Sequence, residues 1–288
     1  MAVTESLAPT RPASSPGRAA PAPAPRARSW LDKVLANPLA GLSPWILYSI
    51  VEGEGRLELS AAVALGLAVA ILSLNWIRGS SPKILEFSDV TYFAALTIVV
   101  ALASPGTHRW LELWGGEVAN VAVFVIAFGS VLARQPFTLQ YAREQVAKEY
   151  WHEPEFLRVN YLITWVWVAA FAIEAASGAY GDLVLRNSNN IWTGWIIQTL
   201  PLIVAAQFTI WYPNRLDALR EGRRDAPTVR DFVGTVAPWI TIVGIIVLSV
   251  GGTPESVGIA CLAGGIVLTR VCTKLDGDGS PASAPTPD

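Results

Sequence analysis

NYLITWVWVAAFAIEAASGAY, residues 160–180, is the stretch that decides the fold. It is predominantly apolar and carries a single charged side chain, Glu174. The hydrocarbon core of a bilayer is about 30 Å thick, and a helix of roughly 20 apolar residues crosses it. Because the bilayer core offers no water to backbone groups, an apolar run of this length must form its hydrogen bonds internally. The stretch therefore predicts a membrane-spanning helix.

The composition of the whole chain indicates the same environment. Of its 288 residues 52% are hydrophobic and only 15% are charged, against about 25% charged in ordinary soluble domains. The net charge of -2 gives no reason to expect a nucleic-acid partner. No cofactor motif is present, so no cofactor is predicted. We expect a multi-pass membrane protein whose first partner is the lipid bilayer.

The apolar stretches divide the chain into a membrane domain and two tails. Residues 1–29 and 276–288 are rich in Pro, Ala and Ser, and both segments are predicted to be disordered. Between them, residues 30–275 form the predicted domain, an all-α bundle of about eight spans. The predicted spans are residues 37–52, 57–77, 88–104, 117–133, 160–180, 191–212, 232–250 and 255–271.

The distribution of basic residues gives the predicted topology. With eight spans and both termini on the cytoplasmic side, 18 of the 21 Lys and Arg residues fall in cytoplasmic segments. The three exceptions are Arg56, Arg109 and Arg186. Cytoplasmic loops of membrane proteins carry an excess of Lys and Arg. The pattern therefore favours a topology with both termini inside, and residues 105–116 are interpreted as an outer loop.

The cytoplasmic loop at 134–159 is the densest mixture of charged and aromatic residues in the chain. We interpret its first part as an amphipathic helix at the headgroup level, ended by Pro154. One interpretation is a simple connector. The other is a docking surface or headgroup site that includes Arg143, Glu144 and Trp151. His152 lies near two glutamates, but their spacing does not supply a closed set of metal ligands, so no metal site is predicted.

Glu174 is the candidate catalytic residue if the chain is an enzyme or a carrier. A carboxylate inside a span is costly when it faces lipid, so it should face protein or water. Helical spacing places Asn160, Thr164 and Trp167 on the same stripe as Glu174, and Gln198 of the next span lies on a neighbouring arc. Two interpretations remain open: these groups fix helix packing by hydrogen bonds, or they line a proton relay or a substrate pocket.

The layout of residues 37–180 resembles the bacterial intracellular septation protein A family. The matching pieces are the Pro-containing segment 37–52, the Arg-Gln-Pro at 134–136, Trp151, Asn160 and the Trp-rich run around Trp167. The resemblance implies a bacterial inner-membrane protein linked to cell division and envelope synthesis, and it brings no catalytic residue. Two spans after residue 212 have no counterpart in that pattern.

Three functions follow as hypotheses. The first is a non-enzymatic component of the envelope or division machinery that docks partner proteins through its cytoplasmic loops. The second is a membrane enzyme acting on a lipid or isoprenoid, an apolar small molecule, with Glu174 as the acid. The third is a small proton-coupled transporter centred on Glu174. The usual sequence motifs for diphosphate, nucleotide, serine-nucleophile and zinc chemistry are all missing from the chain.

Overall fold

The computed structural model describes residues 34–81, 83–187, 190–251 and 253–274, and these residues form helices joined by short turns. The sequence-predicted tails at 1–29 and 276–288 lie outside the described residues. The α-helices are α2 (Pro38–Val51), α3 (Leu57–Ile77), α4 (Ile84–Leu102), α5 (Pro105–Leu132), α6 (Phe137–Gln145), α7 (Pro154–Ala179), α8 (Ile197–Arg220), α9 (Val229–Val250) and α10 (Glu255–Lys274). A 3₁₀ turn, η1 (Lys148–Tyr150), precedes α7, and two π-helical turns, η2 (Tyr180–Val184) and η3 (Trp192–Ile196), join α7 to α8.

Seven of the described helices are long and apolar enough to cross a membrane. The protein is therefore a multi-pass, all-α membrane protein. The sequence predicted eight spans, and the difference is α2. Its 14 residues extend about 21 Å at 1.5 Å per residue, which is less than the thickness of the hydrocarbon core.

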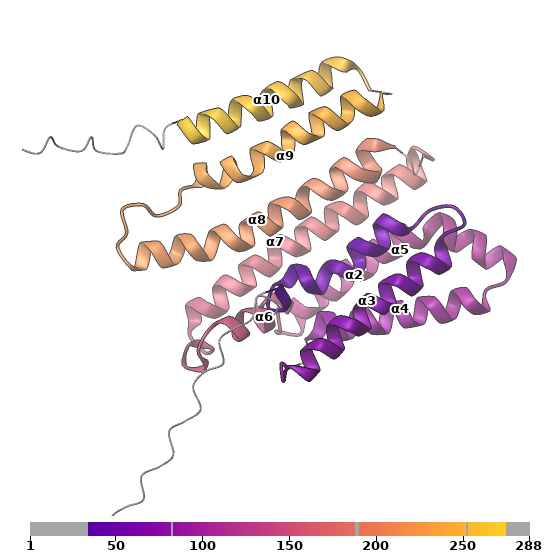
Figure 1. Cartoon of the computed structure of the whole chain (residues 1–288), viewed down its shortest axis with the longest axis horizontal. Coiled ribbons are helices and arrows are strands. Elements are labelled where there is room, and N and C mark those ends of the chain that lie inside the picture. The colour runs from indigo at the N-terminus through magenta and orange to yellow at the C-terminus, as the bar shows by residue number, and fades with distance from the viewer. Residues whose placement is uncertain (1–33, 82, 188–189, 252, 275–288) are drawn as a thin grey trace, which may run out of the picture.

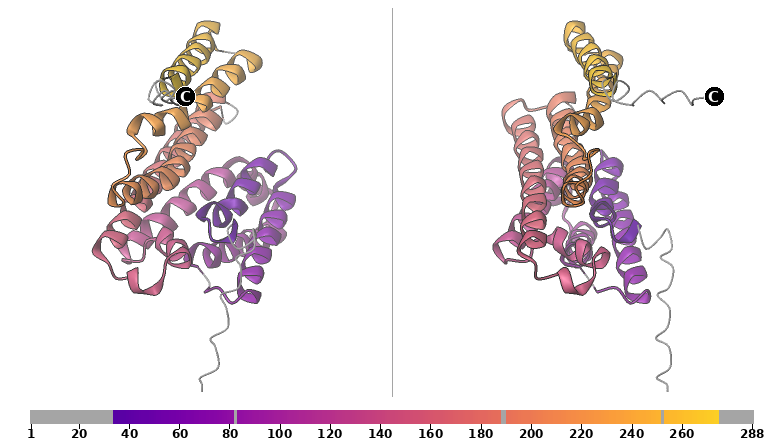
Figure 2. Two further views of the ribbon diagram at one scale, coloured as in Figure 1. Left: turned by 60° about the vertical axis from the view of Figure 1, so that its left-hand side comes forward. Right: turned by 90° about the vertical axis from the view of Figure 1, so that its left-hand side faces the viewer.

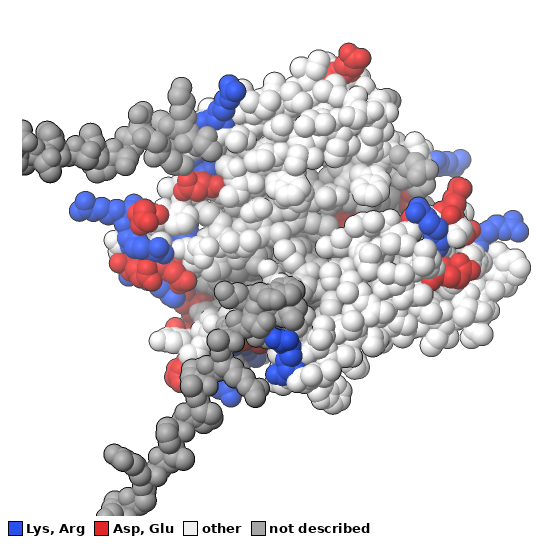
Figure 3. Space-filling model, in the orientation of Figure 1, with Lys and Arg blue, Asp and Glu red and all other residues white. Residues whose placement is uncertain are grey.

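The surface shows where a membrane would lie. In Figure 3 the Lys, Arg, Asp and Glu side chains gather at the two ends of the bundle, and the broad belt between them is almost free of charge. Figure 1 shows the long helices running through this belt from one charged end to the other. Large apolar side chains such as Ile98, Val125 and Ile173 are exposed within it. Exposed apolar surface on this scale requires lipid around it.

The prediction of an outer loop at residues 105–116 is wrong. These residues are helical, because α5 begins at Pro105 behind the N-cap Ser104 and continues to Leu132. Gly115 and Gly116 favoured a turn in the sequence, but their function is close packing. Any side chain at Gly115 would crowd the Tyr48 hydroxyl, and any side chain at Gly116 would overlap the Glu52 carboxylate.

The third predicted span also begins too late, at 88 instead of Ile84. The earlier start brings Glu86 into the helix; Glu86 and Asp89, which the predicted span already included, are both 1% exposed. Lys83 Nζ lies 2.8 Å from Glu86 Oε1, and Trp45 Nε1 donates to Asp89 Oδ1 at 2.6 Å. Buried charge is tolerated when it is paired and hydrogen-bonded. Both acids therefore have partners inside the bundle.

The segment between α5 and α7, called the inner segment after its predicted cytoplasmic location, is folded into the bundle. A helix at its start is confirmed as α6, but it ends at Gln145, and Pro154 begins α7 where the sequence interpretation had it end a helix. Four residues of α6, namely Phe137, Thr138, Leu139 and Tyr141, are buried. Thr138 Oγ1 donates to the Asn160 carbonyl at 3.1 Å. The segment is therefore an inner layer of the protein, packed beneath the spans.

The last two helices form a pair at the edge of the molecule. Figure 2 shows α9 and α10 lying beyond α8, away from α2 to α5. Their own contact is close, because a side chain at Gly244 would overlap the backbone of Leu262 and one at Gly265 would overlap Thr241. Small residues let two membrane helices approach each other in this way. The core that surrounds Glu174 is thus built by α2, α5, α7 and α8.

Candidate functional site

A cavity of about 600 Å³ opens among α2, α5, α7, α8 and the π-helical turns. Its volume is in the range that binds small molecules, which is about 300–1,000 Å³. Four acidic residues of its wall come from different elements: Glu52 follows α2, Glu117 is on α5, Glu174 is on α7 and Asp182 is on η2. We call this space the acidic cavity.

Glycine residues determine how the carboxylates reach the cavity. Glu117 lies against Gly178 of α7, and any side chain there would overlap the Glu117 carboxylate and crowd Gln198 Nε2, 3.1 Å from the added carbon. Glu52 lies against Gly116 of α5 in the same manner. The carboxylates of Glu52 and Glu117 therefore each contact a glycine of a neighbouring helix. This contact lets them approach the cavity that Glu174 of α7 also lines.

All the described charged side chains that line the acidic cavity are acidic. Its lining contains Glu52, Glu54, Glu112, Glu117, Glu174 and Asp182, and among the described residues no Lys, Arg or His joins them. Burial raises the pKa of Glu52 to about 7, and the nearby Asp182 carboxylate adds to the rise. Negative charges held together in a medium of low dielectric repel each other strongly. The cavity can lower that repulsion by taking up protons or by binding a cation.

Two polar groups in the cavity wall have no hydrogen-bond partner. Thr193 is 7% exposed, and its hydroxyl makes no hydrogen bond within the described part of the chain. Glu117 Oε1 is buried and unpaired as well. Buried polar groups in native proteins are almost always hydrogen-bonded, so unpaired ones need an explanation. Partners supplied from the cavity, either water or a polar ligand, give that explanation.

Aromatic rings complete the lining. Trp45, Trp167, Trp195 and Phe171 border the acidic cavity, and the Trp167 and Phe171 ring centroids are 5.6 Å apart. Trp167 is fixed in place because its Nε1 donates to Thr209 Oγ1 at 2.9 Å. Aromatic faces attract cations, and tryptophan does so most strongly. Carboxylates and aromatic rings together form a lining suited to a positively charged, partly apolar molecule.

The structure brings some of the sequence-predicted residues together and separates others. Glu174, Trp167 and Gln198 all line the acidic cavity. Asn160 and Thr164 belong to the same buried stripe of α7 but lie nearer its inner end, where both bond to Thr138 of α6. They pack α6 onto α7 and do not line the cavity.

The loop residues predicted to dock partners form a separate inner cluster. The Arg143 guanidinium lies 5.4 Å from the centroid of the Trp151 ring, and Glu144 lies 3.2 Å from Lys83 Nζ. Trp151 Nε1 also donates to the Val146 carbonyl at 3.1 Å. Arg143, Glu144 and Trp151 thus hold the inner segment to itself and to α4, away from Glu174.

Sequence reasoning missed the second, third and fourth carboxylates of the site. Glu52 and Glu117 were placed at the ends of two other predicted spans, and Asp182 was placed beyond the end of a third. Glu174 therefore appeared to be the only carboxylate inside a span. The available signal was the glycine that faces each carboxylate, because Gly116 and Gly178 are the positions that allow the approach. Nothing in the sequence pairs such a glycine with a given glutamate.

The carboxylates of the cavity wall come from separate elements. Within the part of the chain that the structure describes, no group of three or more His, Cys, Asp or Glu is arranged to hold a metal ion. His152 is exposed on the inner side and belongs to no such group.

The comparisons with known proteins leave this site without a precedent: no family model, no curated protein and no solved structure matches the chain.

Proposed function

We propose that this protein is a membrane carrier that binds a small, partly apolar organic cation in the acidic cavity and exchanges it for protons. The observation that supports this most strongly is the lining of the cavity, in which acids from three helices and one π-helical turn meet aromatic rings without a basic residue among the described residues. Ionisable groups inside a membrane domain usually mark a pathway for substrate or protons.

The proton and the cation would compete for the same groups. At low pH the carboxyls are neutral, because protons relieve their repulsion. A cation that enters the cavity favours the ionised forms and displaces protons. The titratable groups that line the cavity with Glu174 are all acidic or neutral: Tyr48, Glu52, Glu54, Glu112, Glu117 and Asp182. Binding of a cation should therefore release protons and strengthen as the pH rises.

The test is binding of tetraphenylphosphonium, a lipophilic organic cation, to the purified full chain in detergent or nanodiscs. We expect affinity to rise about tenfold per pH unit below about pH 7 for each proton released, with the release visible in weakly buffered calorimetry. Tetraphenylborate, an anion of the same shape, is the matched control and should not bind. Binding of both ions alike, or cation binding that is independent of pH, would refute the proposal.

The same preparation separates a carrier from an enzyme. In proteoliposomes with an imposed pH gradient, a carrier accumulates chemically unchanged tetraphenylphosphonium faster than do empty vesicles, which this lipophilic cation enters unaided. For the alternative of a membrane enzyme on a lipid or isoprenoid substrate, the decisive result would be a chemically altered product recovered from vesicles that contain the protein and absent from empty vesicles.

We also propose that α2 completes the crossing of the membrane, which gives both termini a cytoplasmic location. Two contacts at the opposite end of the bundle support this arrangement. Gly55 N donates to Glu112 Oε1 at 3.2 Å, and His108 Nε2 lies 2.7 Å from Glu58 Oε1. The turn after α2 therefore lies at the outer end of α5. The distribution of Lys and Arg in the sequence favours the same orientation.

Docking of partner proteins at the inner surface is the second candidate function. The specific observation is that the inner segment is rigidly built yet presents an aromatic side chain, since Tyr150 is 51% exposed next to the anchored Trp151. The resemblance to the septation protein A family supports an envelope or division protein in the bacterial inner membrane as the partner. That resemblance stays a prediction.

A photo-crosslinking amino acid at Tyr150 tests the docking function in living cells. We expect one discrete adduct, with the same protein identified in every repeat. The matched position is Ile98, which is 59% exposed on the lipid-facing belt and should give no protein adduct. Equal crosslinking from both positions, or none from position 150, would refute a specific docking surface.

A further inference from the structure

A second cavity of about 250 Å³ lies on the inner side of the acidic cavity. It is bordered by the start of α2, by Gln145 at the end of α6, and by α7 and α8. Three residues, Leu39, Trp167 and Ala206, line both cavities. These three side chains are therefore the partition between the two spaces.

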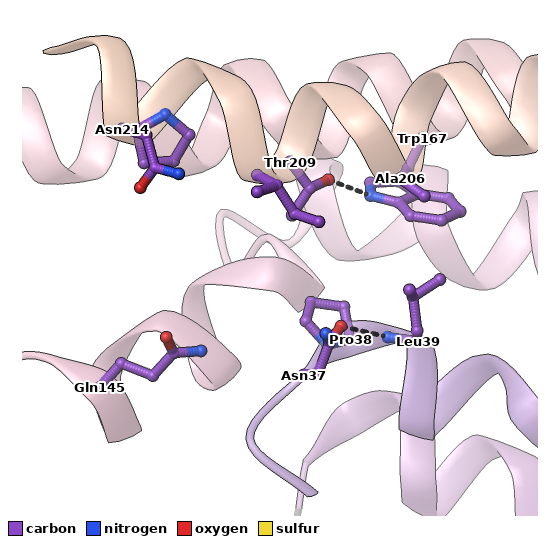
Figure 4. Close-up of a pocket in the computed structure, with 10 residues that line it drawn as sticks. Asn37, Pro38, Leu39, Gln145, Trp167, Ala206, Thr209 and Asn214 are labelled. Carbon is purple, nitrogen blue, oxygen red and sulfur yellow. Dashed lines mark hydrogen bonds between the residues drawn. The ribbon is translucent and has the colours of Figure 1, made fainter. Parts of the chain in front are cut away.

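The geometry points to a single path through the protein, and we propose that the Leu39, Trp167 and Ala206 partition is its closed gate, with the second cavity as the inner vestibule for the same cation. Figure 4 shows Leu39 rising from the α2 side toward Trp167 and Ala206, which belong to the two facing helices. This inference rests on the carrier function proposed above for the acidic cavity.

The position of the partition agrees with a gate. Trp167 and Ala206 each lie near the midpoint of their helical segments, Pro154–Val184 and Trp192–Arg220. A barrier there leaves one cavity facing each side of the membrane. The Trp167 indole is 1% exposed and is held by its hydrogen bond to Thr209, which is itself a wall residue of the inner vestibule.

The lining of the inner vestibule differs from that of the acidic cavity. Its polar side chains are the neutral Asn37, Gln145, Thr209 and Asn214, and no described charged residue borders it. A cation that passes the gate therefore exchanges a site of strong negative potential for one of weak, neutral contacts. This difference suits tight binding on one side of the gate and release on the other.

The helix that carries Ala206 is built to bend. Pro201 and Pro213 lie inside α8 on either side of Ala206, and α8 begins after the π-helical turn η3. Each proline removes a backbone hydrogen bond, and kinks in helices concentrate at prolines and at π-bulges. The segment of α8 between the prolines can therefore shift away from Trp167 without unfolding the ends of the helix.

Cysteine accessibility tests the gate without requiring a known ligand. Cys261 and Cys272 are first replaced by Ser. Thr199→Cys then reports on the acidic cavity and Asn214→Cys on the inner vestibule, because each residue is exposed and lines its own cavity. The reagent is a membrane-impermeant trimethylammonium thiosulfonate, added to sealed vesicles of each orientation. With the gate intact, position 199 should react only from the outer side and position 214 only from the inner side.

Opening the gate should change this pattern. In Trp167→Ala we expect position 199 to react from the inner side at least about tenfold faster than in the parent. Trp165→Ala is the matched control, since Trp165 is on the same helix but 45% exposed on the other face and should leave the pattern unchanged. Leu39→Ala is the milder second variant in case Trp167→Ala does not fold. Position 199 reacting only from outside in both gate variants would overturn the inference.

The outcomes separate this inference from the proposed function. If the gate variants admit the reagent but the parent protein binds no tetraphenylphosphonium at any pH, the carrier function fails and the path remains. If the parent binds the cation with the expected pH dependence but the gate variants stay closed, the acidic cavity stands and the gate is refuted.

Discussion

Glu174→Gln should lower the affinity for tetraphenylphosphonium by roughly 30-fold or more at pH 8. Removing one partner of a buried charged pair typically costs about 2–5 kcal/mol, and each 1.4 kcal/mol is a factor of ten in affinity. The amide keeps the size of the carboxyl but can neither carry the charge nor exchange the proton. We therefore also expect fewer protons released per cation bound. Titration calorimetry at pH 6 and pH 8 measures both quantities.

The matched control for this change is Glu58→Gln. Glu58 is in the first turn of α3 and pairs with His108 of α5, but it is largely exposed and lies outside the cavity lining. Surface pairs of this kind contribute about 0–1 kcal/mol, so the control should bind like the parent. A Glu174→Gln protein that keeps the full affinity and the full pH dependence would contradict the carrier function. The docking function, by contrast, is expected to tolerate that change.

Lys83→Met should destabilise the fold by about 3–5 kcal/mol, the usual cost of breaking a buried ion pair by removing one partner. Lys83 is 2% exposed, and its Nζ lies 2.8 Å from Glu86 and 3.2 Å from Glu144. The ammonium also lies 4.9 Å from the centroid of the Tyr141 ring, and burial raises the pKa of that phenol well above its ordinary value. Without the lysine, two carboxylates lose their neutralising charge.

The measurement is thermal or denaturant unfolding of the purified protein in one fixed detergent. Lys148→Met, a change of the same kind at an exposed position 5.9 Å from the Trp151 ring, should shift stability by less than about 0.5 kcal/mol. The double variant Lys83→Met with Glu86→Gln should recover part of the loss, because it removes one uncompensated charge. Equal melting of Lys83→Met and the parent would show that the cluster around Lys83 contributes no net stability.

The membrane fold could be predicted from hydropathy, and the buried polar groups could not. The apolar runs at 57–77 and 232–250 predicted α3 and α9 almost to the residue, because lipid imposes length and apolarity on each helix independently. The start of α4 was missed because Glu86 raises the apparent cost of burial. Asp89 is paired by Trp45 of α2, and Glu86 is paired by Asn75 of α3 as well as by the neighbouring Lys83, so much of the compensation is a property of the tertiary structure.

The candidate site was predicted only in part, because the sequence shows the pattern within one helix but not the contacts between helices. Periodicity alone placed Glu174 and Trp167 on the inward face of their helix, and the structure puts both in the cavity wall. Periodicity also included Asn160 on that face, but it gives no position along the helix axis relative to the neighbouring helices. Asn160 therefore lies beside α6, away from the cavity. The carboxylates of Glu52 and Glu117 depend on glycines in other helices, which no single segment reveals.

The contact between Glu117 and Gly178 also affects the rate at which the site works. Gly178 has no side chain to enclose the Glu117 carboxyl, so we expect Glu117 to leave the surface of α7 by rotating its own side-chain dihedral angles. Rotations of unrestrained side chains take picoseconds to nanoseconds, whereas collective helix motions take microseconds to milliseconds. Loading and unloading of the carboxyl should therefore reach equilibrium many times during each excursion of α8, and we expect helix motion to set the turnover.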